Sequence, residues 1–310
     1  MLTSHDLPSQ DRPSNGMIAA WNNIPSNIRG ACFVAVGGFL LIAMAALVKH
    51  LGQTLPPFEV LFVRFLAGLV VILPLVWRIG IKIVYTKKIQ LHAARGFVGF
   101  IGNMLFFFAL VHVPLADTVT IQFSRPLLMI VVAALFLKEN VSLKRKVITL
   151  AGFVGILMIT KPFSEGFDPW ALSALGGAFF GTLVVLTVKL LTRTEQTVTI
   201  MFYFAVFTTL FAFVPAMLTW QTPTWIELGL MILAGTLGII GQGLFTHGLG
   251  MGETSFIMPF DYLRIIYSFL LGIILFSEVP GLWSLGGGVV IIASSVYLLR
   301  TESRHPTVKS

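Results

Sequence analysis

Long apolar segments joined by short polar connections make up the chain from residue 30 onward. A helix needs about 20 residues to cross a hydrocarbon core about 30 Å thick. Windows of that length predict ten transmembrane helices, over residues 30–48, 58–77, 92–112, 115–137, 144–160, 169–189, 196–219, 225–249, 253–276 and 281–299. The connections leave few residues for a soluble domain. The predicted fold class is therefore an all-α membrane protein.

Lys and Arg residues are distributed unevenly between the two sides of these predicted spans. With the N-terminus placed in the cytoplasm, the outside segments contain only Lys49 and Lys161. The cytoplasmic segments contain sixteen cations: Arg12, Arg29, Arg78, Lys82, Lys87, Lys88, Arg95, Lys138, Lys144, Arg145, Lys146, Lys189, Arg193, Arg300, Arg304 and Lys309. Cytoplasmic loops carry the excess of Lys and Arg. We therefore expect a multi-pass protein of the cytoplasmic (inner) membrane with both termini inside.

An internal repeat divides the chain into two halves. Residues 92–160 align without a gap on residues 231–299, at an offset of 139 positions. Upstream of this segment, Lys49 aligns with Lys189 at an offset of 140. The equivalent pairs are Gly96 and Gly235, Gly99 and Gly238, Gly102 and Gly241, Asn103 and Gln242, Arg125 and Arg264, and Glu139 and Glu278. Five helices in each half place the second half upside down relative to the first, as in many secondary transporters. The predicted organisation is a cytoplasmic tail (1–28), a first repeat (29–162), a second repeat (168–300) and a second tail (301–310).

Composition excludes several classes of protein. Only 11% of the 310 residues are charged, whereas an ordinary soluble domain has about 25%. The net charge of +8 lies in the predicted cytoplasmic loops, so it does not indicate nucleic-acid binding. The single cysteine, Cys32, forms no intrachain disulfide and no zinc-binding cysteine cluster. The chain has no P-loop, HExxH or GxSxG motif. We predict no cofactor, no metal and no catalytic residue.

Three segments resemble a known family. They are PPFEVLFVRF, RGFVGFIGNMLFFFALVHVPLADTVTIQFSRPLLMIVVAALFLKE and, more weakly, GQGLFTHGLGMGETSFIMPFDYLRIIYSFLLGIILFSE. Together they are similar to the EamA family of the drug/metabolite transporter superfamily. The resemblance implies two five-helix repeats around a central cavity. It also implies a carrier for amino acids, metabolites, nucleotides or drugs.

Three arginines lie near the middle of predicted spans: Arg64, Arg125 and Arg264. A charge at the bilayer centre costs roughly 2.5–3.5 kcal/mol on insertion scales, so these side chains are expected to face the bundle interior. Asp261 lies one helical turn before Arg264 and is its expected partner. Arg125 has no acidic residue within a turn of its own helix. An anionic or zwitterionic solute is therefore predicted to complete its charge, and a structural ion pair with another helix is the alternative.

Polar residues at equivalent positions of helices four and nine, Gln122 and Arg125 in the first and Asp261 and Arg264 in the second, predict the binding site. The predicted substrate-binding residues are Arg64, Asn103, Gln122, Phe123, Arg125, Gln242, Asp261, Tyr262 and Arg264. Hydrogen-bonded contacts between helices are the alternative role for the polar members of this set. Glu59 and Asp261 are the candidates for proton coupling. Glu139 and Glu278, which close helices four and nine, are interpreted as structural.

The predicted function is secondary transport of a small, amino-acid-like or similar metabolite by alternating access. The two repeats would rock against each other, and Pro126 and Pro259 would help helices four and nine to bend. The expected partners are the solute, membrane lipids and a proton or counter-solute. An intramembrane enzyme acting on a lipid-linked substrate and a non-transporting scaffold are the alternatives. The enzyme would need a nucleophile and a base close together, and the scaffold would need soluble interaction segments.

Overall fold

A computed structural model describes residues 24–135, 142–162, 168–192 and 194–303. Its elements are α2 (Ser26–Leu51), α3 (Pro57–Ile79), η1 (Ile81–Val84), α4 (Ile89–His112), α5 (Leu115–Gln122), α6 (Arg125–Leu135), α7 (Leu143–Thr160), α8 (Trp170–Leu191), α9 (Thr197–Leu218), α10 (Trp225–Gly250), α11 (Thr254–Ile257), η2 (Met258–Tyr262), α12 (Leu263–Phe276) and α13 (Leu282–Ser303). These described residues contain helices and no strand. The all-α fold class is therefore confirmed.

Eight of the predicted spans are long and apolar enough to cross a membrane within the described residues. The other two are α7, whose first turn contains three cationic residues, and α13, which has a shorter apolar stretch. The predicted tails lie mostly outside the described residues, as does Glu139. Ten helical spans, two of them interrupted, thus account for the ten predicted windows.

The helices predicted over residues 115–137 and 253–276 are each interrupted near their middle, which corrects the prediction of two single helices. The first is divided into α5 and α6 immediately before Pro126. The second begins as the short α11, continues as the 3₁₀ helix η2 around Pro259, and becomes α12. Proline has no backbone N–H, and its ring clashes with the carbonyl four residues earlier. The two prolines therefore account for the interruption of both helices.

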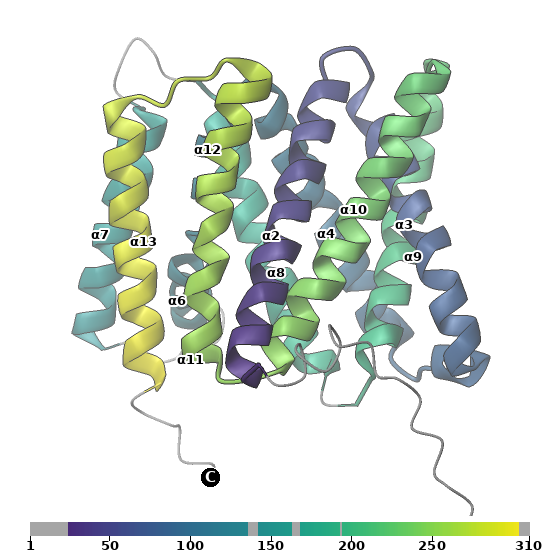
Figure 1. Cartoon of the computed structure of the whole chain (residues 1–310), viewed down its shortest axis with the longest axis horizontal. Coiled ribbons are helices and arrows are strands. Elements are labelled where there is room, and N and C mark those ends of the chain that lie inside the picture. Colours follow the sequence, from purple (N-terminus) through teal and green to yellow (C-terminus); the bar gives the residue numbers. More distant parts are fainter. Residues whose placement is uncertain (1–23, 136–141, 163–167, 193, 304–310) are drawn as a thin grey trace, which may run out of the picture.

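The long helices pack in pairs. α2 packs along α10, and α4 packs along α8. The pair α3 and α9 lies at one end of the bundle, and the pair α7 and α13 lies at the other (Figure 1). α2 begins and α13 ends at the lower edge of the bundle in Figure 1, whereas α2 and α12 both end at the upper edge.

Glycines bring the paired helices together at equivalent places. A Cβ atom on Gly37 of α2 would lie 2.8 Å from the carbonyl oxygen of Gly241 in α10. A Cβ atom on Gly177 of α8 would lie 3.1 Å from the carbonyl oxygen of Gly102 in α4. Small residues at such crossings let two backbones approach closely. The two crossings are consistent with the predicted repeat, because Gly102 and Gly241 are equivalent positions in it.

Candidate functional site

The two interrupted helices meet through a pair of aromatic rings. Phe123 follows α5, and Tyr262 ends η2. Their ring centroids are 5.1 Å apart and their planes differ by 27°, which is a stacked arrangement. The two residues occupy equivalent positions in the repeat. The interruptions of the two helices therefore place matching residues of the two halves against each other.

Arg264 is held on several sides in this region. Its Nη2 atom lies 2.5 Å from Oδ2 of Asp261, a carboxylate that is 6% exposed. The guanidinium lies over the rings of Phe123 and Phe245, at 5.1 and 5.5 Å from their centroids. Gly38 of α2 makes room for the side chain, because a Cβ atom there would lie 2.8 Å from Cγ of Arg264. The charge of Arg264 is therefore matched by a neighbouring carboxylate, as the spacing predicted.

Arg125 has different partners. Its Nη2 atom donates to Oε1 of Gln122 at 2.7 Å, and the amide of Gln122 donates to the carbonyl of Ala174 in α8 at 3.1 Å. The guanidinium also lies against the backbone of Gly181, where a Cβ atom would be 2.9 Å from Nε. Arg125 remains exposed, and no ion pair involves it within the described part of the chain. Its charge is hydrogen-bonded to an amide but is not neutralised by a carboxylate.

Electrostatic interactions link this arginine to the other half of the site. The guanidinium of Arg264 repels that of Arg125 through space, and the carboxylate of Asp261 attracts it. Six of the nine predicted substrate-binding residues thus form what we call the central cluster: Gln122, Phe123, Arg125, Asp261, Tyr262 and Arg264. The cluster contains two guanidinium groups and one carboxylate. It has one positive charge more than its own residues balance.

Arg64 and Asn103 form a separate pair between α3 and α4. Arg64 donates to Oδ1 of Asn103 at 2.9 Å, and Asn103 donates to the carbonyl of Gly99 at 2.8 Å. Gln242, the repeat counterpart of Asn103, is exposed and makes a 3.4 Å contact with Thr246 of its own helix. The two equivalent amides therefore have different surroundings. In the described residues, no hydrogen bond or ion pair joins either amide to the central cluster.

Glu59 lies at the start of α3 and is fully buried. Its Oε2 atom accepts a hydrogen bond from the backbone N–H of Gln221 at 2.9 Å, and its Oε1 atom has no partner. Within the described residues, no ion pair joins it to Arg64. Of the two predicted proton-coupling residues, Asp261 therefore belongs to the central cluster and Glu59 does not.

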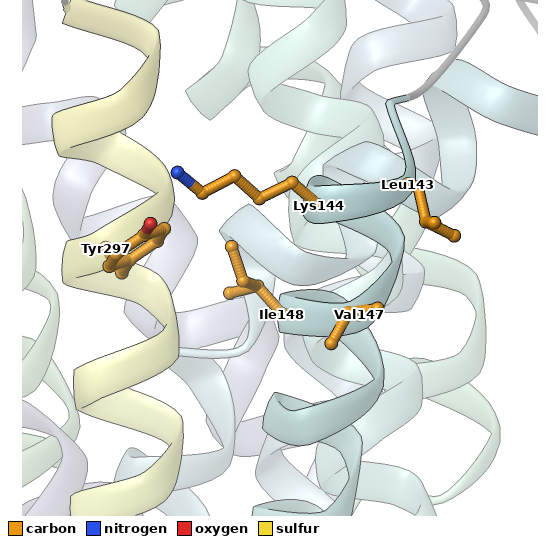
Figure 2. A pocket seen from close by; sticks show the side chains of 5 residues that line it. All are labelled: Leu143, Lys144, Val147, Ile148 and Tyr297. Carbon is orange, nitrogen blue, oxygen red and sulfur yellow. The ribbon is translucent and has the colours of Figure 1, made fainter.

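A shallow depression on the surface lies between the start of α7 and the end of α13 (Figure 2). It is lined by Leu143, Lys144, Val147, Ile148 and Tyr297. Lys144 reaches across it and lies 5.3 Å from the centroid of the Tyr297 ring. None of these residues belongs to the central cluster. We therefore do not assign the depression to the candidate site.

A second group of charged residues was missed by the sequence analysis. Lys49 and Glu278, which are 229 positions apart, form an ion pair with Nζ and Oε1 separated by 2.7 Å. Asp117 accepts a hydrogen bond from the hydroxyl of Ser284 in α13 at 3.1 Å. The only signal in the sequence was the presence of Lys49 and Lys161 on the side that has few cations. In the described residues, no group of three or more His, Cys, Asp or Glu side chains is placed to hold a metal ion.

Comparison with known proteins gives consistent matches over most of the chain. The sequence model of the EamA-like transporter family matches residues 28–161. An S-adenosylmethionine uptake transporter of Rickettsia bellii is 30% identical over 282 residues, which cover 89% of this chain and 97% of that protein. The pseudopaline exporter CntI of Pseudomonas aeruginosa is 29% identical and covers 88% and 96%. A riboflavin transporter of Vibrio cholerae is 28% identical and covers 89% and 95%. A solved crystal structure with 18% identity has the same fold, with a TM-score of 0.61 over 89% of this chain and 99% of that one.

Proposed function

The chain belongs to the EamA-like transporter family, and we propose that it carries a small organic solute with a carboxylate or similar anionic group through the central cluster. Family membership makes the protein a small-metabolite transporter and not an enzyme. The proposal about the solute depends on one observation. Arg125 is hydrogen-bonded to Gln122 and has no carboxylate partner among the described residues.

The physical argument concerns the unbalanced charge. A charge within the membrane-spanning part of a protein is stabilised when it pairs with an opposite charge or faces a polar pathway. The planar guanidinium group of arginine binds a carboxylate or a phosphate through two parallel hydrogen bonds. The negative group of an anionic or zwitterionic solute would therefore pair with Arg125 as the carboxylate of Asp261 pairs with Arg264. The exposed side of Arg125 would then line the solute pathway.

The names of two relatives support a solute with a planar ring, and one of the two solutes also has a charged amino-acid group. S-adenosylmethionine contains an amino-acid carboxylate and a purine, and riboflavin contains a planar ring system. Phe123 stacks on Tyr262 and lies against Arg264, so an aromatic surface adjoins the charged part of the cluster. We propose that these rings contact the planar part of the solute while Arg125 binds its anionic group.

We propose that transport proceeds by alternating access, with the repeats at residues 29–162 and 168–300 rocking against each other. Discontinuous helices at a repeat interface are typical sites of solute binding in such carriers. The interruptions before Pro126 and around Pro259 would let the two halves of each helix move separately. Both interruptions adjoin the central cluster.

We further propose that Asp261 couples transport to protons. One oxygen of its carboxylate accepts from Arg264, and the other is buried without a partner. Protonation of Asp261 would remove the negative charge that balances Arg264, so the affinity of the cluster for an anion would rise. In proteoliposomes, Asp261→Asn should abolish the dependence of uptake on a proton gradient while exchange of solute for solute continues. If Glu59→Gln has this effect instead, the coupling role belongs to Glu59.

The solute proposal is tested with purified protein in proteoliposomes and a panel of labelled metabolites. Each acid is compared with its methyl ester, which has the same shape without the negative charge. We expect the acids to be carried and the esters to be excluded. Arg125→Lys keeps the positive charge but loses the two-pronged geometry, so uptake should fall about tenfold. The same substitution at the exposed Arg78 is the matched control. Esters carried as fast as acids would overturn the proposal.

We also propose that both termini are cytoplasmic and that the membrane is the inner one. The support is the excess of Lys and Arg on the side where α2 begins and α13 ends. A reporter that is active only outside the cell should give no signal when it is fused to the C-terminus. The same reporter in the connection between α7 and α8 should give a signal. The reverse result would overturn this orientation.

A further inference from the structure

The two lysines on the sparsely charged side of the protein lie in the same charge cluster. Lys49 pairs with Glu278, and Asp117 interacts electrostatically with Lys49, Lys161 and Glu278. Lys161 also lies close to the connection before α13, since its Nζ atom is 4.0 Å from where a Cβ atom on Gly281 would be. Two cations and two carboxylates therefore meet at the edge of the bundle where α2 ends.

Lys49 joins three segments of the chain. Its Nζ atom lies 2.7 Å from Glu278 and donates to the carbonyl oxygen of Val113 at 2.7 Å. The second oxygen of Glu278 accepts from the backbone N–H of Leu115, the first residue of α5, at 2.7 Å. The Lys49 side chain is only 6% exposed. The end of α2, the connection between α4 and α5, and the connection after α12 are thus tied by one buried ion pair.

An unusual backbone conformation brings Glu278 to this position. Ser277 ends α12 with φ at 56°, in the left-handed region that non-glycine residues rarely adopt. The chain turns back so that the N–H of Glu278 donates to the carbonyl of Gly272 at 3.0 Å. The carboxylate lies over that glycine, 3.2 Å from where a Cβ atom would be. Such conformations persist where the surroundings enforce them, and they are common at switch regions.

The edge of the bundle around this cluster is closely packed. Leu51, Phe107 and Leu115 are each no more than 1% exposed, and the hydroxyl of Ser284 ties α13 to Asp117. At the opposite edge, Lys189, the repeat counterpart of Lys49, is exposed, and Glu139, the counterpart of Glu278, lies outside the described residues.

We propose that Lys49, Asp117, Lys161 and Glu278 form a charge lock that closes the carrier on the side where α2 ends and opens once in each transport cycle. The inference rests on the proposed alternating-access mechanism. Glu278 follows α12, whereas the other three residues lie near the end of α2, the start of α5 and the end of α7, so the lock opens when the connection after α12 moves away from them. A buried ion pair suits this role because its net contribution to stability is small compared with apolar packing, while it specifies one arrangement. Water solvates the separated charges when the lock opens.

The experiment measures the access of a reagent to a buried reporter between the lock and the central cluster. Cys32 is first replaced by Ser, and Ser268, which is fully buried in α12, is replaced by Cys. A charged, membrane-impermeant thiol reagent is applied to proteoliposomes on the face where α2 ends. Glu278→Gln should raise the labelling rate about tenfold, because the open population grows when the ion pair is lost. Lys49→Met should raise it by a similar factor.

The matched control is Glu227→Gln, which removes a carboxylate at the same edge. Glu227 bonds to Thr54 and forms the capping box of α10 with Thr224, and a glutamine preserves that box. Its labelling rate should equal that of the parent protein. The double variant Lys49→Met/Glu278→Gln should label no faster than either single variant, since the same link is lost only once.

Two results would overturn the lock. The first is an unchanged labelling rate in the folded Glu278→Gln and Lys49→Met proteins. The second is failure of both variants to fold, because an ion pair required for folding is a structural link and not a lock. Labelling needs no solute, so the outcome is independent of the test on Arg125. A lock that opens as expected beside esters carried as fast as acids would reject the proposed solute and retain the lock.

Discussion

Arg125 and Arg264 occupy equivalent positions in the two halves of the chain, yet their surroundings differ. Arg264 has a carboxylate 2.5 Å away and two aromatic rings against its guanidinium. Arg125 has the side-chain amide of Gln122 at 2.7 Å and no acidic partner in the described residues. The repeat therefore duplicated the cation without duplicating its counter-charge.

Equivalent positions of a repeat can therefore have different roles. At the position that matches Asp261 in the other half stands Gln122, so one residue decides whether each arginine is neutralised. A neutralised arginine holds helices together, whereas an unneutralised one is available to an anionic ligand. The following predictions test this division, from the largest expected effect to the smallest.

Removal of the paired arginine should have the largest effect. Arg264→Gln leaves the 6% exposed carboxylate of Asp261 without its partner, which should lower the stability of the protein by about 3 kcal/mol. Melting temperature in detergent measures the change. Arg264→Gln/Asp261→Asn removes both charges and should recover most of the loss. Equal melting temperatures for Arg264→Gln and the parent would contradict the assigned role of the pair.

A carboxylate can be placed beside Arg125 to make it resemble Arg264. Gln122→Glu introduces a negative charge at the atom that already accepts from Arg125 at 2.7 Å. The internal carboxylate should compete with the solute, so uptake should fall about tenfold or more while the protein stays folded. The isosteric substitution Gln242→Glu is the control, because no hydrogen bond among the described residues joins Gln242 to Arg125. Uptake at the wild-type rate by Gln122→Glu would show that Arg125 does not bind the solute.

Removal of the unpaired arginine, Arg125, should raise the stability of the empty carrier. Arg125→Gln eliminates a charge that has no counter-charge, so the empty carrier should become more stable by about 1 kcal/mol. Uptake should fall below that of Arg125→Lys. The measurement compares the melting temperatures of Arg125→Gln and Arg264→Gln in the same detergent. A loss of stability in both variants would mean that the two arginines have the same structural role.

The aromatic contact between the halves should contribute least. Phe123→Leu removes a stacked ring and one cation–π contact, which should cost about 0.5–1.5 kcal/mol of stability. Tyr262→Phe keeps the ring and should change the melting temperature very little. Uptake of an aromatic solute should fall more in Phe123→Leu than uptake of an aliphatic one. Equal losses for both solutes would indicate that the ring contributes only packing.

Helix number, fold class and the candidate arginines followed from the sequence, because a hydrocarbon core imposes a length and an apolar composition on every span. The pairing of Arg264 with Asp261 was also predictable, since one turn of a helix places such residues side by side. The interruption of helices four and nine was only partly predictable. Pro126 and Pro259 indicated bending, but the extent to which a proline interrupts a helix depends on the helices that pack against it.

Contacts between distant segments were decided by the tertiary structure alone. The sequence placed Asn103 and Gln242 at equivalent positions, but only the fold joined Asn103 to Arg64 and left Gln242 exposed. Lys49 and Glu278 are far apart along the chain, and no local rule pairs them. Helix periodicity and membrane partitioning act on neighbouring residues, so the sequence alone determines spans and intrahelical pairs. The packing of ten helices in three dimensions determines which charges meet across the bundle.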